Sequence, residues 1–342
     1  MEKSLNILLM PLAWLWSRVL WLRHRLYDTG RLKSHAFSVP VIDVGNLQLG
    51  GTGKTPMTEY LIRLLRDDFK IAVLSRGYKR RSKGYLEADK HATPALIGDE
   101  PYQIHRKFGP EVIVAVDTDR VHGVRRLLER HRPGLIILDD AFQHRRIRAR
   151  VDLLLTPFHR PFFRDRLIPA GRLRDLPARA RQASAILVTK TPENASVTEK
   201  QNILRALQAY GKPVFFTGLR YGQARNAREQ TCSLIRPGAR ILLVTGIADA
   251  EPLLQYLHKQ GVQVDHLPFA DHRHYGPAAL NRIRRAWEAK DYDGMLTTEK
   301  DFVKLQLHFP GICYLPVEVS IENEQHFKNW LYEQIKSRKP IR

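Results

Sequence analysis

Short apolar runs recur along the first part of the chain, and a polar or helix-like stretch separates each run from the next. Such runs predict the strands of a parallel sheet that helices cover on both faces. The predicted strands are 40–45, 71–75, 112–116, 135–138, 151–155 and 186–189. A helix is predicted between the first two of them, ending near residue 66.

A second series of apolar runs follows, again with helix-like stretches between its members. Its predicted strands are 241–246, 262–267 and 294–297. The polar stretch 221–240, which contains Arg and Gly, is the best candidate for a linker. A length of 342 residues also favours two domains over one. We therefore predict an α/β fold, with a larger domain over 36–220 and a smaller one over 241–335.

The N-terminal segment 1–35 contains a nearly continuous apolar run, 5–22, with three tryptophans. Arg18 interrupts the run, and an arginine inside a membrane-spanning helix is costly. A cleaved signal peptide is disfavoured because Glu2 balances Lys3 and no small-residue cleavage site follows. Tryptophans flanked by arginines suit an amphipathic helix that lies in the lipid headgroup layer. The alternative is a helix packed on the protein's own core; we favour membrane association.

The formal net charge is +21, which predicts attraction to polyanions: nucleic acid, anionic lipid or a phosphorylated substrate. Charge alone does not choose among them. Arginines are dense over 160–181, where aromatic and aliphatic residues lie between them. The two cysteines, Cys232 and Cys313, are far apart in the sequence and lack metal-ligand spacing, so we expect two buried, reduced thiols in a cytosolic protein.

The sharpest motif is the glycine-rich turn Gly50-Gly51-Thr52-Gly53-Lys54-Thr55, which lies between a predicted strand and a predicted helix. Glycines allow backbone N–H groups to surround phosphate oxygens, and the helix N-terminus adds a partial positive charge. Lys54 is expected to reach the β- and γ-phosphates of ATP, and Thr55 to ligate Mg²⁺. Gln48 departs from this motif, because the full pattern has glycine there.

The second motif is the apolar strand 135–138, which runs directly into two carboxylates, Asp139 and Asp140. This arrangement is typical of a Walker B strand, so Asp139 is predicted to hold the magnesium ion with Asp140 beside it. An Asp pair after a strand is also found in ordinary turns and helix caps. The phosphate-binding turn favours the metal-binding interpretation.

Several strings, in order along the chain, resemble the tetraacyldisaccharide 4'-kinase family, the lipid A kinases of Gram-negative bacteria. They extend from the N-terminal helix to about residue 305, and the ordered set is far more specific than any one string. The strings are Val44-Gly45-Asn46, Gly50 to Pro56, Ser75-Arg76-Gly77-Tyr78, Gly98-Asp99-Glu100-Pro101, Asp139 to Arg145, Pro169-Ala170-Gly171, Leu173-Arg174, Asp271-His272 and Thr298-Glu299-Lys300-Asp301.

The resemblance implies a P-loop NTPase-like domain that transfers the γ-phosphate of ATP, with Mg²⁺, to the 4'-hydroxyl of a tetraacylated glucosamine disaccharide 1-phosphate. It also implies a monotopic enzyme at the cytoplasmic face of the bacterial inner membrane. By motif, Lys54 and Thr55 match the phosphate and Mg²⁺ groups, and Asp139 matches the Walker B ligand. Asp99 matches the family's proposed catalytic base, and His272 its supporting partner from the second domain.

The acceptor side of the site is implied in the same way. Gln143 and His144 match residues near the acceptor and the metal, and Arg120 matches, more loosely, a basic residue that faces the transferred phosphate. We assign Asp140 and Arg174 to the substrate as well. Arginine suits bidentate contact with phosphate, and the aromatic residues of 160–181 suit acyl chains.

Some alternatives stay open. Asp99 precedes Glu100-Pro101, a common helix N-terminus, and Asp271-His272 is also typical of a surface turn. His274 competes with His272 for the place beside the site, and Asp175 stands where the family commonly has glutamate. Thr298 to Asp301 resembles either a base-recognition motif or a capping segment.

Two other functions fit parts of the sequence. A partitioning-type ATPase switch is disfavoured because Leu49 stands where those proteins carry an extra lysine. A nucleic-acid-binding ATPase would account for the positive charge, but no RNA-binding signature is evident, and no nucleic acid is expected as a partner. A membrane-surface kinase of an acylated, phosphorylated disaccharide explains most of the motifs.

Overall fold

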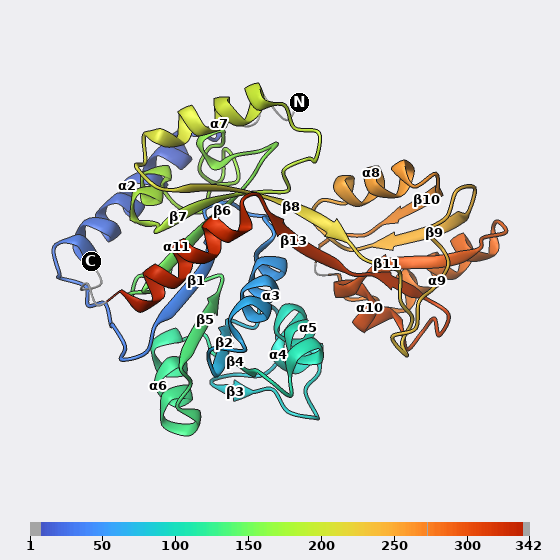
Figure 1. Cartoon of the computed structure of the whole chain (residues 1–342), viewed down its shortest axis with the longest axis horizontal. Helices are drawn as coiled ribbons and strands as arrows, with labels where there is room; N and C mark the ends of the chain where they lie inside the picture. The colour runs from blue at the N-terminus through green and yellow to red at the C-terminus, as the bar shows by residue number, and fades with distance from the viewer. Residues whose placement is uncertain (1–7, 272, 338–342) are drawn as a thin grey trace.

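The computed structural model describes residues 8–271 and 273–337, which form two α/β domains joined by long crossing strands (Figure 1). The larger sheet has the order β13-β8-β7-β6-β1-β5-β2-β4-β3. Its strands pair in parallel except at the two edges, where β3 and β13 run antiparallel to their neighbours. The strand bounds are β1 (Val41–Asn46), β2 (Ile71–Ser75), β3 (Leu86–Glu87), β4 (Ile113–Val116), β5 (Leu135–Asp139), β6 (Val151–Pro157), β7 (Ala185–Thr189), β8 (Val214–Tyr221) and β13 (Val317–Ile321).

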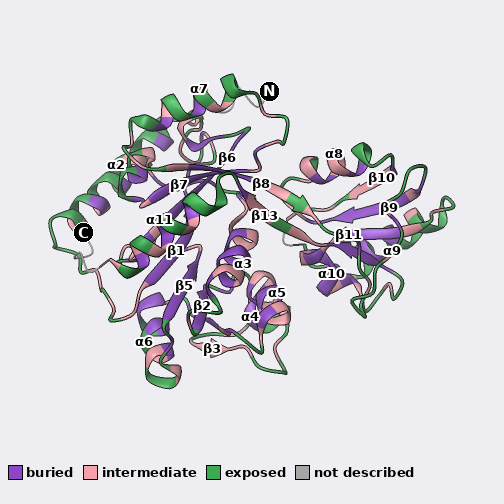
Figure 2. Cartoon of the chain, viewed as in Figure 1, coloured by how far each residue is buried: buried purple, intermediate pink, exposed green. Residues whose placement is uncertain are grey.

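Helices cover both faces of the larger sheet, as Figure 2 shows by the buried strands between exposed helical surfaces. Alternate residues of β1 enter separate cores: Ile42 and Val44 pack with α3 and α11, whereas Val41 packs with α6. The predicted α/β fold with a doubly covered parallel sheet is therefore confirmed. The helices of this domain are α2 (Met10–Asp28), α3 (Lys54–Leu65), α4 (Pro94–Ile97), α5 (Asp99–Phe108), α6 (Arg120–His131), α7 (Val197–Gln208) and α11 (Glu324–Lys336), with 3-10 turns at Phe162–Arg164 and Pro177–Gln182.

The smaller sheet has the order β10-β9-β11-β12, and all of its pairs are parallel. Its strands are β9 (Arg240–Thr245), β10 (Gln263–Pro268), β11 (Gly294–Thr298) and β12 (Cys313–Leu315), and its helices are α8 (Glu251–Lys259), α9 (Pro277–Glu288) and α10 (Glu299–Leu305). The chain then returns to the larger domain, because β13 pairs with β8 and α11 packs in the larger core. The last part of the range 241–335, which the sequence analysis placed in the smaller domain, thus belongs to the larger domain.

The expectation of two reduced thiols is wrong, because Cys232 and Cys313 form a disulfide. The stretch between β8 and β9 lies along the edge of the smaller sheet, where Arg225 and Tyr314 exchange two backbone hydrogen bonds of 2.8 Å. This pairing brings two cysteines that are 81 positions apart in sequence next to each other.

Helix α2 buries one narrow stripe and exposes the rest of its apolar surface. Ala13, Leu20 and His24 are buried, whereas Trp14 is 59% and Trp21 54% exposed. Within residues 8–271 and 273–337, no helix combines the length and apolar character that crossing a bilayer requires. The first residues of the predicted segment 1–35 lie outside the described part of the chain.

Candidate active site

The glycine-rich turn connects β1 to α3 at the carboxyl edge of the larger sheet. Gly50 and Gly53 have φ angles of 106° and 88°, a region that glycine adopts without strain. Asn46 Nδ2 donates a 2.7 Å hydrogen bond to Thr52 Oγ1, and Thr189 Oγ1 donates one of 2.8 Å to the carbonyl of Thr52. The turn is therefore anchored on both sides, and the N-terminus of α3 is left facing a cavity, as anion binding requires.

Gln48, the residue that departs from the usual motif, has a structural role here. It is only 3% exposed, and its Nε2 donates to the carbonyl of Arg160 and to Asp165 Oδ2, at 3.1 and 3.2 Å. The side chain thereby attaches the start of the turn to the arginine-rich stretch.

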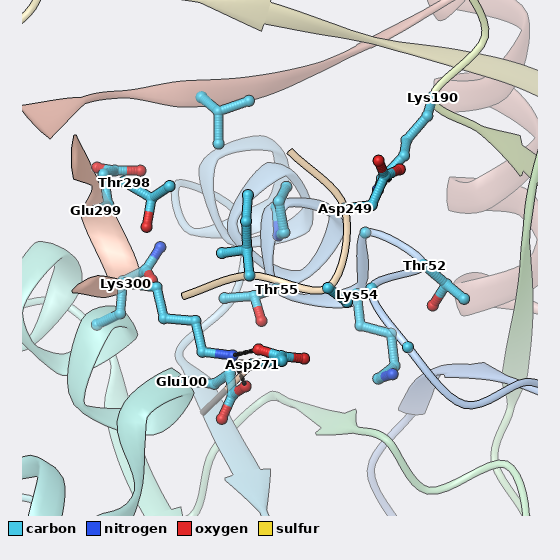
Figure 3. A pocket seen from close by; sticks show the side chains of 18 of the residues that line it. Thr52, Lys54, Thr55, Glu100, Lys190, Asp249, Asp271, Thr298, Glu299 and Lys300 are labelled. Carbon is cyan, nitrogen blue, oxygen red and sulfur yellow. Dashed lines mark hydrogen bonds and ion pairs between the residues drawn. The ribbon is translucent and has the colours of Figure 1, made fainter. Parts of the chain in front are cut away.

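The cavity has a volume of about 510 Å³ and lies between the two domains. The larger domain contributes the glycine-rich turn, Asp139, Asp140 and Arg174 to its lining; the smaller domain contributes Asp249, Asp271 and 298–300. In Figure 3, Lys54 and Thr55 lie across the cavity from Thr298 and Glu299, and Lys300 reaches Glu100 and Asp271. The lining also includes apolar or aromatic side chains: Leu219, Tyr221, Ile247, Leu253, Leu315 and Val317. This combination of size and polarity is typical of a small-molecule site.

The two carboxylates after β5 differ in their electrostatics. Asp139 is 4% exposed, and burial together with the charge of Asp140 raises its pKa to about 7. Burial also acts to raise the pKa of Asp140, but Lys54 and Arg174 outweigh it and lower the value to about 2. Lys54 Nζ lies 3.8 Å from Asp140 Oδ1, and Arg174 binds both carboxylate oxygens of Asp140. Asp140 is therefore ionised at neutral pH, whereas Asp139 is only partly ionised and loses its proton when a cation approaches.

The site fits a magnesium ion of the kind that P-loop enzymes use. Asp139 Oδ1 is buried and has no hydrogen-bond partner among the described residues, so it is available as a ligand. Thr55 lines the same cavity. The described residues contain no group of three or more His, Cys, Asp or Glu side chains arranged as a metal site. A P-loop site needs none, because one hydroxyl and one carboxylate suffice when phosphate and water complete the coordination.

Asp99 begins α5 at the boundary between the domains. Lys304 of α10, in the smaller domain, donates a 2.7 Å hydrogen bond to Asp99 Oδ2 and one of 3.2 Å to the carbonyl of Arg273. Asp99 and the backbone carbonyl of Arg273 thus share one lysine. His272 itself lies outside the described residues, and His274 is exposed.

Two of the residues predicted to face the acceptor, Gln143 and Arg174, contact the same backbone carbonyl, and Arg174 also binds Asp140. Gln143 Nε2 donates a 2.6 Å hydrogen bond to the carbonyl of Asn46, and Arg174 reaches the same carbonyl at 3.3 Å. Burial and the charge of Arg120 lower the pKa of His144 to about 4, so its imidazole is neutral. Arg120 is 3% exposed, and burial and nearby Arg76 lower its pKa.

Sequence reasoning named Lys300 without a role and did not single out Lys107 and Lys304, yet all three lysines connect the two domains. Lys107 Nζ of α5 donates to Glu59 at 2.6 Å and to Glu299 at 2.9 Å. Burial and the charge of Glu59 raise the pKa of Glu299 to about 7. Lys300 and Lys304 are four positions apart, so they share one helix face, a spacing that could have indicated their common direction.

Comparisons with known proteins agree with this geometry. A family model described as tetraacyldisaccharide-1-P 4'-kinase matches residues 5–336. The tetraacyldisaccharide 4'-kinase of Bacteroides thetaiotaomicron is 41% identical over 343 residues, which cover 94% of this chain and 90% of that protein. The enzyme of the same name from Cytophaga hutchinsonii is 40% identical over 329 residues, covering 94% and 93%.

A solved structure is also similar over almost the whole chain. It is the "apo" form of LpxK from Aquifex aeolicus in complex with ATP, which is 31% identical and has a TM-score of 0.77. The similarity covers 97% of this chain and 99% of that one. With its glycine-rich turn, its paired carboxylates and these relatives, the chain belongs to the tetraacyldisaccharide-1-P 4'-kinase family.

Proposed function

We propose that the chain transfers the γ-phosphate of ATP to the 4'-hydroxyl of tetraacyldisaccharide 1-phosphate, a step of lipid A biosynthesis. The observation that carries the proposal is one cavity lined by the glycine-rich turn, Asp139, Asp140 and Arg174. Family membership supplies the acceptor, and the ATP complex of the Aquifex relative supports the donor.

ATP is bound through its phosphates. The backbone N–H groups of 50–55 and the ammonium of Lys54 hold the β- and γ-phosphates, and the apolar residues of the lining suit the base. Thr55 and Asp139 hold Mg²⁺, whose chemistry here is to neutralise charge on the phosphate oxygens.

The transfer needs a proton acceptor and positive charge at the γ-phosphate. Asp99 accepts the proton of the 4'-hydroxyl while the hydroxyl oxygen bonds to the γ-phosphorus; the bond from that phosphorus to the β–γ bridging oxygen breaks, which releases ADP. His272, which lies outside the described residues, is assigned to support Asp99 by its match to the family motif. Arg120 and Arg174 stabilise the transferred phosphoryl group, and Gln143 and neutral His144 contact the acceptor.

Helix α2 holds the enzyme at a membrane surface, where the acyl chains of the acceptor reside. The exposed tryptophans of α2 and its two exposed arginines, Arg18 and Arg25, suit the interface between headgroups and acyl chains. Because ATP is a cytosolic donor, the proposed location is the cytoplasmic face of the inner membrane, with monotopic attachment. Co-sedimentation with anionic vesicles tests this; a protein that stays in the supernatant would contradict it.

A transfer assay tests the activity. Radiolabelled ATP, Mg²⁺ and the acylated disaccharide 1-phosphate in detergent should yield labelled lipid. Lys54→Ala and Asp99→Ala should each lose at least about a hundred-fold in turnover, because they remove phosphate stabilisation and the general base. Exposed Lys259→Ala and Asp291→Ala are matched controls and should retain full activity.

Other outcomes identify other functions. ATP hydrolysis without labelled lipid would favour a partitioning-type switch. Salt-dependent RNA binding without lipid phosphorylation would favour a nucleic-acid-dependent ATPase. Unchanged turnover of Asp99→Ala would remove Asp99 from the role of base while leaving the kinase activity in place.

A further inference from the structure

The inner stripe of α2 contains a buried polar group. Of the residues that α2 buries, Ala13 and Leu20 are apolar, but His24 is an imidazole that is 6% exposed. His24 Nε2 lies 2.6 Å from Asp175 Oδ1, and the side chain of Asp175 is fully buried. Arg145 Nη1 lies 3.4 Å from the other ring nitrogen, so the tautomer with its proton on Nε2 satisfies both contacts.

This hydrogen bond is a main source of stabilisation for the buried carboxylate. Asp175 Oδ1 also accepts a 2.8 Å hydrogen bond from the backbone N–H of Leu176, while Arg179 Nε lies 3.8 Å from Oδ2. A carboxylate removed from water is stable only when it is paired and hydrogen-bonded. Loss of His24 would leave Asp175 short of a partner, and the loop would have to move to rehydrate it.

Asp175 directly follows Arg174, which binds Asp140 in the cavity. The backbone N–H of Arg174 donates a 2.9 Å hydrogen bond to the carbonyl of Leu47, so the arginine is held between that bond and the buried Asp175. The direction of the Arg174 guanidinium therefore depends on where the Asp175 side chain is anchored. Its anchor is a residue of α2.

The same turn of α2 also holds the loop that follows β5. Arg23 Nη2 donates a 2.8 Å hydrogen bond to the carbonyl of Gln143, and Arg145 Nη1 donates one of 3.0 Å to the carbonyl of His24. Both loops that carry the acceptor-side residues thus meet on one turn of the helix whose outer surface is exposed and apolar.

We propose that His24 is a positioning residue: through Asp175 it holds Arg174 on Asp140, and it thereby makes the geometry of the catalytic cavity depend on the seating of α2. This inference rests on the proposed kinase function. His24 does not touch the cavity, so its effect is on turnover through Arg174 rather than on ATP affinity.

The experiment compares three single variants in the full-length protein. His24→Phe keeps the ring shape and removes the hydrogen bond, and His24→Gln can return an N–H close to the position of Nε2. Exposed His258→Phe, on α8 of the smaller domain, is the matched control. For each variant we measure the urea midpoint, the affinity for a fluorescent ATP analogue, and kcat and KM with the acylated disaccharide 1-phosphate.

We expect His24→Phe to lower kcat about ten- to a hundred-fold, the usual effect of losing a hydrogen bond to a charged group, with ATP affinity unchanged within about two-fold. His24→Gln should recover most of the turnover, and His258→Phe should match the native protein. Because Asp175 acts through the same link, the double variant His24→Phe/Asp175→Asn should lose no more turnover than the worse single variant.

Native turnover in folded His24→Phe would overturn the inference, and so would additive losses in the double variant. A His24→Phe protein that unfolds early, together with a folded but inactive His24→Gln, would overturn it as well, because the restored hydrogen bond would then have no effect on turnover. Failure of the native protein to phosphorylate the disaccharide is a separate result that contradicts the proposed function itself.

Discussion

Replacement of Asp139 by Asn should stabilise the protein in the absence of nucleotide while it abolishes phosphate transfer. The ionised Asp139 is 4% exposed and lies beside Asp140, and these two conditions raise its pKa from 3.8 to about 7. In the unfolded chain the same carboxyl is solvated and ionises near its ordinary value. Above pH 7 the folded protein therefore holds a charge that the unfolded chain accommodates better.

The magnitude and its pH dependence follow from linkage. A folded-state pKa above the unfolded one means that stability falls as pH rises from about 4, and the loss is complete above about 7. At 1.36 kcal/mol per pKa unit the full loss is about 4 kcal/mol. The buried amide of the variant makes imperfect hydrogen bonds, which lowers its stability gain by about 1–2 kcal/mol. Asp139→Asn should therefore be more stable by about 2–3 kcal/mol at high pH and nearly equal at about pH 5.

Urea unfolding of both proteins in chelator, between about pH 5 and about pH 8, measures this difference. Asp291→Asn, a change at an exposed carboxylate, is the control and should show no trend. Mg²⁺ with ATP should reverse the order, because the ligand stabilises the native protein and the variant lacks the proposed carboxylate ligand. A stability difference that is constant with pH, or a native protein that is the more stable one at high pH without ligand, would refute the electrostatic reasoning.

Three further predictions concern other parts of the molecule. Lys107→Met should lower the free energy of unfolding by about 3 kcal/mol in urea titrations, since it removes the ammonium between two buried glutamates: Glu59 keeps its contacts with Gln103 and Arg63, but Glu299 loses its cross-domain ion pair. Trp14→Ala should weaken binding to anionic vesicles about ten-fold and leave the urea midpoint unchanged, because the ring is 59% exposed. Cys232→Ser should destabilise the smaller domain by about 4 kcal/mol, because the disulfide closes a loop with a sequence separation of 81.

Each of these has a result that would count against it. An unchanged midpoint for Lys107→Met would mean that the cross-domain contact contributes nothing. Lys328→Met, which breaks a partly exposed ion pair with Glu324, is the control substitution. Vesicle binding that is insensitive to Trp14→Ala would place the membrane contact elsewhere. Two titratable thiols in urea without reductant would show that the disulfide does not form.

The strands that sequence predicts best are those buried on both faces, such as β1, β2 and β5, because their runs are almost entirely apolar, with Asp43 of β1 as the interior exception. Strands β8 and β13 and helix α11 escaped prediction. β13 has mixed burial, and its partner β8 lies about a hundred residues earlier in the chain. Only the pairing itself shows that the chain returns to the larger sheet after the smaller domain.

The residues of the site fall into two groups, those in local sequence motifs and those that meet only through packing. The glycine-rich turn and the carboxylate pair are local motifs, so sequence alone indicates their chemistry. The link from Lys304 to Asp99 and the one from His24 to Asp175 join residues 205 and 151 positions apart, and they depend on how the elements pack. The disulfide was not predicted either, because its two cysteines meet only through the packing of elements 81 positions apart.

Phosphorus NMR of the reaction product tests most directly whether the γ-phosphate of ATP is transferred to the 4'-hydroxyl of the disaccharide. Purified protein incubated with Mg²⁺, ATP and the acylated disaccharide 1-phosphate should yield a lipid with a second phosphomonoester coupled to the proton at the 4'-carbon. A lipid that still carries only its 1-phosphate after the ATP has been consumed would contradict the account.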